Sequence, residues 1–195
     1  MVGEGMLLVM AHPALERSRA NQKMMQAARE VAGLTLHDLY EVYPAFTIDV
    51  RAEQKRLMQH QIIGLQFPMY WYSTPALLKE WIDLVWLHGF AYGIGGTALE
   101  GKRLFVACTT GGRAEYYGPD GQNRYTMEEF LRPLEQTARL CGMEWEKPFV
   151  LHASGAKTEL ALQAGADAYR RRLAALAAVA VFVEPEGPAI QEIRE

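Results

Sequence analysis

Three consecutive aromatic residues, Tyr70, Trp71 and Tyr72, form the first group in the sequence that could bind a ligand. They follow the apolar run 62–67, which has the β-branched and aromatic content of a buried strand, and a helical pattern starts at Pro75. Open α/β sheets bind ligands at the carboxyl ends of their strands, so we expect a stiff apolar shelf suited to a flat ring. Packing against neighbouring loops explains the aromatics equally well when this stretch is considered alone.

A second group lies where the first apolar run, 6–10, ends. His12 follows this run, and a helical pattern begins at about Ser18, with Arg19 and Asn21 in its first turn. The free backbone N–H groups and the helix dipole attract an anion there, by typically about 0.3–1 kcal/mol, which predicts a phosphate site. The glycine-rich fingerprint of a Rossmann dinucleotide loop is absent.

A third group, Thr109, Thr110, Gly111 and Gly112, ends the apolar run 103–109. Small residues and hydroxyls at the end of a strand allow the backbone to approach a ligand closely. The three loops together match flavin mononucleotide (FMN), whose phosphate, ring face and pyrimidine edge would each meet a different loop.

The elements that must position these residues follow from the hydrophobic pattern. Strands are expected at 6–10, 34–38, 62–67, 103–109 and 149–152, and helices at about 18–31, 51–59, 75–86, 127–141 and 160–178. This alternation predicts an α/β three-layer sandwich with a five-stranded parallel sheet of flavodoxin-like order 2-1-3-4-5. We expect one domain over residues 1–183 and a flexible C-terminal tail over 184–195.

Charge and composition narrow the function. A net charge of -3 and a pI near 6.0 provide no basic field for a phosphate backbone, so nucleic acid is not expected as a partner. Cys108 and Cys141 stand among apolar residues, which predicts reduced, buried thiols. The N-terminus has no signal-peptide pattern and the run 173–183 is too short to span a bilayer, so we expect a cytoplasmic protein.

The remaining polar residues carry no clear site. His37, His60, His88 and His152 show no metal-ligand spacing, so no metal site is expected and these residues are interpreted as structural. Carboxylates on the helical patterns are explained by solvated faces and helix pairs.

Several motifs together also resemble a known family. They are Ala11-His12-Pro13 with Ser18 and Asn21, Pro68 to Ser73 running into Pro75 to Trp81, Gly89-Phe90-Ala91-Tyr92-Gly93, and Thr109 to Gly112. This set resembles the flavodoxin-like NAD(P)H:quinone oxidoreductases. The likeness is greatest to the ancillary flavoproteins of glutathione-regulated potassium-efflux systems, and it extends over about residues 6–173.

The resemblance implies a set of cofactor-binding residues. The phosphate and ribityl end maps onto His12, Ser18, Arg19, Ala20 and Asn21. The ring maps onto Met69, Tyr70, Trp71 and Tyr72, and its polar edge onto Thr109, Thr110, Gly111 and Gly112. In such enzymes a hydride passes from NAD(P)H to the flavin, and a quinone then takes two electrons.

The resemblance also implies partners. Phe90 and Tyr92 match positions that line the substrate pocket from a second subunit, which implies a homodimer, and the helical stripe with Trp81 and Trp86 is consistent with an interface. Association with a membrane potassium-efflux protein, at the inner face of the cell membrane, is also implied. FMN is preferred over FAD because this short chain shows no adenine-binding segment.

Two departures from the family pattern bear on catalysis. Many relatives have Gln where this chain has Tyr70. Better-studied reductases also place a Tyr and a His in the loop after the Thr-Thr-Gly-Gly motif; Tyr117 fits the first, but no His lies between Gly112 and Met127. Tyr117 is therefore the one catalytic candidate, and the alternative is a regulatory ancillary subunit with little or no turnover. A one-electron shuttle is disfavoured, since a charge of -3 is too small for an acidic docking face.

Overall fold

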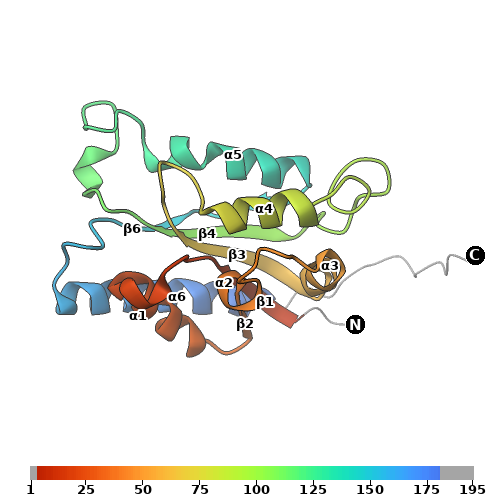
Figure 1. The fold of residues 1–195 in the computed structure, drawn as a ribbon, viewed down its shortest axis with the longest axis horizontal. Coiled ribbons are helices and arrows are strands. Elements are labelled where there is room, and N and C mark those ends of the chain that lie inside the picture. Colours follow the sequence, from red (N-terminus) through yellow and green to blue (C-terminus); the bar gives the residue numbers. More distant parts are fainter. Residues whose placement is uncertain (1–3, 181–195) are drawn as a thin grey trace, which may run out of the picture.

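The computed structural model describes residues 4–180 and centres on one parallel sheet (Figure 1). The strands are β1 (Glu4–Met10), β2 (Leu34–Asp38), β3 (His60–Pro68), β4 (Arg103–Thr109), β5 (Glu144–Trp145) and β6 (Phe149–Leu151). Their order is β2-β1-β3-β4-β5, with β6 also paired to β4. The flavodoxin-like order predicted from the sequence is confirmed. The predicted tail, 184–195, and the domain boundary at 183 lie outside the described residues.

The fifth position of the sheet holds two short strands rather than the single one expected. Leu104 pairs with Trp145 in β5, and Ala107 pairs with Phe149 in β6. The edge strand therefore advances four residues while β4 advances three, which is a bulge of one residue. Pro148 lies in this bulge, where a missing backbone donor is tolerated.

Helices cover both faces of the sheet (Figure 1). They are α1 (Arg19–Arg29), α2 (Leu39–Val42), α3 (Val50–Met58), α4 (Ala76–Val85), α5 (Met127–Leu140) and α6 (Glu159–Ala180). The helices α4 and α5 lie on one face, and α1 and α6 lie on the other. The short α2, whose N-terminus is capped by the Asp38 side chain, lies between the expected strand at 34–38 and the expected helix at 51–59, where no helix was predicted. Among the described helices, none is long and apolar enough to cross a membrane.

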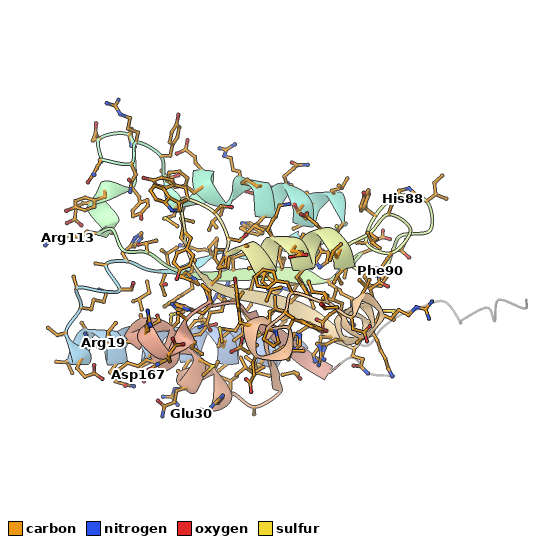
Figure 2. All side chains as sticks on the ribbon, in the orientation of Figure 1. Arg19, Glu30, His88, Phe90, Arg113 and Asp167 are labelled. Atoms are coloured by element: carbon orange, nitrogen blue, oxygen red, sulfur yellow. The ribbon has the colours of Figure 1, made fainter. Side chains whose placement is uncertain are left out.

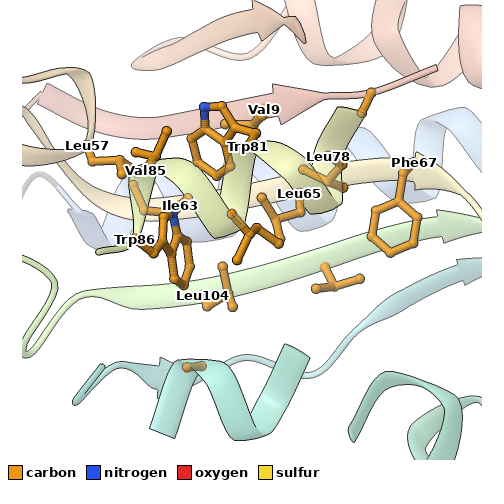
Figure 3. Close-up of a cluster of buried hydrophobic side chains, with 14 of the residues drawn as sticks. Val9, Leu57, Ile63, Leu65, Phe67, Leu78, Trp81, Val85, Trp86 and Leu104 are labelled. Carbon is orange, nitrogen blue, oxygen red and sulfur yellow. The ribbon is translucent and has the colours of Figure 1, made fainter. Parts of the chain in front are cut away.

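Alternation along the strands divides the core in two. Leu7 and Val9 of β1 face α4, whereas Met6 and Leu8 face α1 and α6. Figure 3 shows the first cluster, in which Trp81 and other α4 side chains pack onto the strands. Each large apolar side chain buried in this way stabilises the fold by roughly 1.5–3 kcal/mol.

Trp81 and Trp86 belong to this internal cluster. Trp81 is fully buried and Trp86 is only 5% exposed. The suggestion that their stripe contributes to a subunit interface was therefore wrong, because the chain covers both indoles itself.

Candidate functional site

The carboxyl ends of β1, β3, β4 and β6 meet around a cavity of about 530 Å³, here called the edge cavity. Among the residues predicted from sequence, those that line it are His12, Ser18, Arg19, Ala20, Asn21, Met69, Tyr70, Thr109 and Gly111. Its size falls within the roughly 300–1,000 Å³ typical of small-molecule sites. The three loops that the sequence analysis singled out thus converge on one space.

His12 presents a neutral imidazole to the edge cavity. Its Nδ1 lies 3.1 Å from the backbone N–H of Ala14 and accepts a hydrogen bond from it. Since an amide N–H only donates, the imidazole proton sits on Nε2. Burial lowers the pKa of His12, partly opposed by the charge of Glu16, so the ring acts as a neutral Nε2–H donor near pH 7.

Ser18 and Asn21 organise the start of α1. Ser18 Oγ accepts from the Asn21 backbone N–H at 3.2 Å and from Asn21 Nδ2 at 3.1 Å, and donates to no group among the described residues. Asn21 Nδ2 also donates to Thr109 Oγ1 at 2.9 Å, which ties α1 to the end of β4. Asn21 Oδ1 is buried and has no hydrogen-bond partner in the described part of the chain. An unpaired buried polar atom costs stability, so this site retains capacity for a ligand.

The charge at the edge cavity is positive. Arg17 and Arg19 line it, and none of the described residues that line it carries a carboxylate. Arg19 also forms a salt bridge of 2.9 Å with Glu159. Arg17 is mostly exposed, and its Nε lies 3.6 Å from a carboxylate oxygen of Glu16. Together with the start of α1, these guanidinium groups suit a phosphate.

The aromatic triplet forms a tight turn. Tyr70 and Ser73 exchange two backbone hydrogen bonds of 3.0 Å, and the φ angles of Trp71 and Tyr72 are 47° and 64°. Positive φ at both central positions is typical of a type I′ turn, in which Gly, Asn or Asp are usual. Each such residue costs about 1–3 kcal/mol, and strain of this kind clusters at functional sites.

This turn divides the expected shelf. Tyr70 lines the edge cavity with its ring 6.3 Å from that of His12. Trp71 is 94% exposed, and Tyr72 stacks on Phe130 at 4.9 Å, on the other side of the turn. The three rings do not form one surface within a single chain, because successive residues in the left-handed conformation aim their side chains in different directions.

The loop after β4 forms the opposite wall. Thr110 is buried, and its hydroxyl donates to the Gly112 carbonyl at 2.9 Å. The Ser154 and Ala153 N–H groups donate to the Thr110 and Gly112 carbonyls at 2.9 and 2.8 Å. A Cβ added to Gly111 would meet no atom within 4 Å, so its backbone faces open space. The loop is a firm cradle with one bare backbone segment, which suits the edge of a planar ring.

Tyr117 and His152 lie behind this cradle. The Tyr117 hydroxyl would be 3.1 Å from a Cβ on Gly112, and its ring lies 5.2 Å from that of His152. His152 Nδ1 lies 3.1 Å from Thr110 Oγ1. The hydroxyl of Thr110 has one proton, which it donates to the Gly112 carbonyl. In the contact with His152, Nδ1 therefore carries the proton and donates it to Thr110 Oγ1. Tyr117 does not line the edge cavity, and His152, which follows β6, lies beside both Tyr117 and Thr110.

Phe90 and Tyr92 lie elsewhere. Figure 2 shows Phe90 and His88 at one end of the molecule and Arg19 and Arg113 at the other. Tyr92 lines a second cavity of about 310 Å³, here called the helix cavity, between α4 and α5. A single chain does not bring either aromatic to the edge cavity, so their predicted role requires a second copy.

Some lining residues were missed by the sequence analysis. Arg17, Ser154 and Gly155 also line the edge cavity. Ser154 and Gly155 follow β6, and the carboxyl ends of all strands in a parallel sheet share one edge, so strand order alone could have found them. Residues 4–180 contain no group of three or more His, Cys, Asp or Glu able to hold a metal ion.

Known proteins are similar to this chain in both sequence and architecture. A family model described as flavodoxin-like fold matches residues 5–173. The glutathione-regulated potassium-efflux system ancillary protein KefG of Pectobacterium carotovorum is 48% identical over 168 residues, covering 86% of this chain and 92% of that protein.

Solved structures agree. The general stress protein 14 of Treponema denticola, in complex with FMN, has a TM-score of 0.83 and 38% identity, covering 88% of this chain and 99% of that one. An NADPH-quinone reductase from P. pentosaceus has a TM-score of 0.79 and 32% identity, covering 87% and 97%. Sheet order, edge cavity and sequence similarity lead to one assignment: the chain belongs to the family of proteins with the flavodoxin-like fold.

Proposed function

We propose that this protein is a flavin-dependent NAD(P)H:quinone oxidoreductase that uses FMN. The observation that carries the proposal is the edge cavity, which has a positive helix start with an unpaired buried Asn21 Oδ1 at one side and a bare backbone cradle at the other. Similarity to an FMN complex and to an NADPH-quinone reductase supports it.

The residues of the chain divide the work of binding. His12 Nε2, the Ser18 hydroxyl and the two arginines would hold the phosphate by charge-assisted hydrogen bonds. Met69 and Tyr70 would cover part of the ring, while the Thr109 to Gly112 segment would receive its polar edge through backbone groups. When bound, FMN supplies the capacity to accept a hydride from NAD(P)H and pass two electrons to a quinone. The protein would then bind and orient FMN and its substrates and exclude water from them. Tyr117 would support the cradle from the side away from the edge cavity.

The same function needs a homodimer. Among the described residues, the two most exposed large apolar side chains are Trp71 (94%) and Ile94 (93%). They flank opposite ends of α4, a ten-residue helix that spans about 15 Å. In a twofold dimer, each patch meets the other patch on the partner. An antiparallel pairing of α4 with its copy would cover both side chains and carry the partner's Phe90 and the partner's Tyr92 toward the edge cavity.

The direct test is the purified protein itself. We expect a yellow sample whose flavin, released by heat, has the mass of FMN, and which oxidises NADPH or NADH when given a soluble quinone. Recovery of FAD would reverse the choice of cofactor. A chain that takes up no flavin when FMN is added would contradict the proposal.

The 48% identity to KefG favours a second candidate function, that of an ancillary subunit which regulates a membrane potassium-efflux protein from the inner face of the cell membrane. Co-purification with such a protein, together with retained regulation by a variant unable to turn over quinone, would support this role. Failure to associate in both flavin-bound and flavin-free states would exclude it.

A further inference from the structure

The helix cavity is a second apolar hollow that the binding of a flavin leaves unused. Ile82 of α4 and Trp86, which follows the last residue of α4, form one wall, and Leu131 and Leu134 of α5 form the other. Ile82, Trp86 and Leu131 are each less than one tenth exposed. Its volume of about 310 Å³ lies at the low end of the roughly 300–1,000 Å³ range of ligand pockets, which suits a short apolar group.

The charges at the rim of this cavity cancel. Lys79 Nζ lies 2.6 and 2.7 Å from the two carboxylate oxygens of Asp83, one helical turn away, and both residues line the cavity. Within residues 4–180, no other charged side chain lines this cavity. A neutral apolar group is therefore the favoured occupant, because an ion would gain no partner here and would lose its hydration.

The helix cavity adjoins the edge cavity. Met69 lines both, and the turn from Tyr70 to Ser73 is their common wall, with Tyr70 on one side and Tyr72 on the other. A molecule whose ring reached the reacting face near this turn could extend a side chain along Tyr72 and into the helix cavity without crossing the core.

We propose that the helix cavity binds the apolar side chain of the quinone, so that the preferred acceptor is a quinone carrying one or two isoprenyl units rather than a bare ring. This inference rests on the proposed function, and it adds the substrate class. Branched isoprenyl carbons match the aliphatic walls from Ile82, Leu131 and Leu134, and burial of such a chain is favourable in proportion to its apolar area.

The test compares one benzoquinone ring with no side chain, with one isoprenyl unit and with two. We expect KM to fall by about tenfold per unit at unchanged kcat, because a side chain remote from the reacting carbonyls binds equally in the ground and transition states. Equal kcat/KM for all three quinones would overturn the inference, while reduction of the bare ring would still uphold the proposed function.

Two variants locate the effect. Leu134→Trp fills the cavity, and Leu140→Asp places a charge at its mouth on a side chain that is already 61% exposed, so the second variant leaves the core intact. Both variants should abolish the decrease in KM that the isoprenyl units produce, and both should leave the KM of the bare ring unchanged. The matched control is Leu160→Trp on the 82% exposed Leu160 of α6, which lies on the other face of the sheet.

Binding to flavin-free protein provides a readout besides turnover. Quinones quench tryptophan fluorescence on contact, and Trp86 lines the cavity. We expect the quinone with two units to quench at about 100-fold lower concentration than the bare ring, and Trp86→Phe to remove most of this signal. Equal quenching by both quinones would show that the isoprenyl chain binds outside the helix cavity. So would a loss of the tighter binding of the isoprenyl quinones in Leu160→Trp that equals the loss in Leu134→Trp.

Discussion

Two polar regions of this molecule, built on opposite principles, lie beside the same sheet. Around Glu53, which is fully buried, Tyr43 and Trp81 each donate at 2.8 Å, and His37 Nε2 lies 3.0 Å from the carboxylate. Burial alone would raise the pKa of Glu53, but His37, with help from Trp81 and Tyr43, lowers it below its ordinary value. In this Glu53 cluster the carboxylate accepts hydrogen bonds from Tyr43 and Trp81 and lies at ion-pair distance from His37, so its partners all come from the chain itself.

The edge cavity is the open counterpart. Asn21 Oδ1 has no partner among the described residues, Ser18 keeps a free hydroxyl proton, and Trp71 and Tyr72 hold a strained backbone. The Glu53 cluster uses polar groups to join β2, α3 and α4, whereas the edge cavity leaves comparable groups to a ligand. Changes in the first region should therefore affect folding, and changes in the second should affect binding.

The largest effect is expected from Glu53→Ala. It leaves the buried Tyr43 phenol and Trp81 indole without their acceptor and removes the carboxylate that lies beside His37, so the free energy of unfolding should fall by about 3–5 kcal/mol. Urea denaturation measures this loss. Glu41→Ala, on an exposed residue, is the control and should stay within about 0.5 kcal/mol of the parent. A loss below about 1 kcal/mol for Glu53→Ala would show that the cluster does not hold these elements together.

Gly111→Leu should separate binding from folding. Its new side chain enters the open space beside Gly111, so FMN affinity should fall by at least about 100-fold, or 2.7 kcal/mol, with stability within about 0.5 kcal/mol of the parent. Flavin titration and urea denaturation give the two numbers. Gly111→Ala should be intermediate, and unchanged FMN affinity in both variants would place the ring outside this cradle.

Trp71→Gly should raise stability. Glycine relieves the left-handed strain at φ 47°, and a side chain that is 94% exposed forfeits little packing, so we expect a gain of up to about 1 kcal/mol in the isolated chain. Trp71→Ala keeps the strain and should show no gain. Both variants should weaken the proposed dimer in sedimentation, and self-association unchanged by either variant would exclude Trp71 from the interface.

The smallest effect concerns pH. Burial lowers the pKa of both His12 and His152 from 6.5, so below that pH the unfolded chain binds more protons than the folded one. Stability is therefore fully present above pH 6.5 and falls as the pH decreases toward the lowered values. Comparison of unfolding at about pH 7.5 and about pH 5.5 tests this, and His12→Asn should flatten the slope. A stability that rises on acidification would contradict the assignment of a neutral, buried His12.

The sequence predicted the strand order and the convergence of the loops better than it predicted the conformation of individual turns and the burial of individual side chains. Strand periodicity and the small residues after β4 were enough to foresee that loops from β1, β3 and β4 converge, because parallel strands share one carboxyl edge. The division of Tyr70 from Tyr72 could not be foreseen, since positive φ at Trp71 and Tyr72 contradicts the usual turn chemistry. Glu53 was also missed, because a carboxylate in a charged helical pattern normally predicts a solvated face.

The bulge between β5 and β6 decides which way the edge strand faces. Trp145 and Val150 both pack on the α5 side, although they are five positions apart and strict alternation would place them on opposite faces. Phe149 packs on Tyr169 of α6, with 5.2 Å between the ring centroids. Side chains alternate with period two, so deletion of one residue from 146–148 would invert this strand. His152 would then turn away from Thr110 and Tyr117, and Phe149 from its place beside Tyr169. The one extra residue in the edge strand thus lets Trp145, Phe149 and His152 each point to the layer or wall to which it contributes.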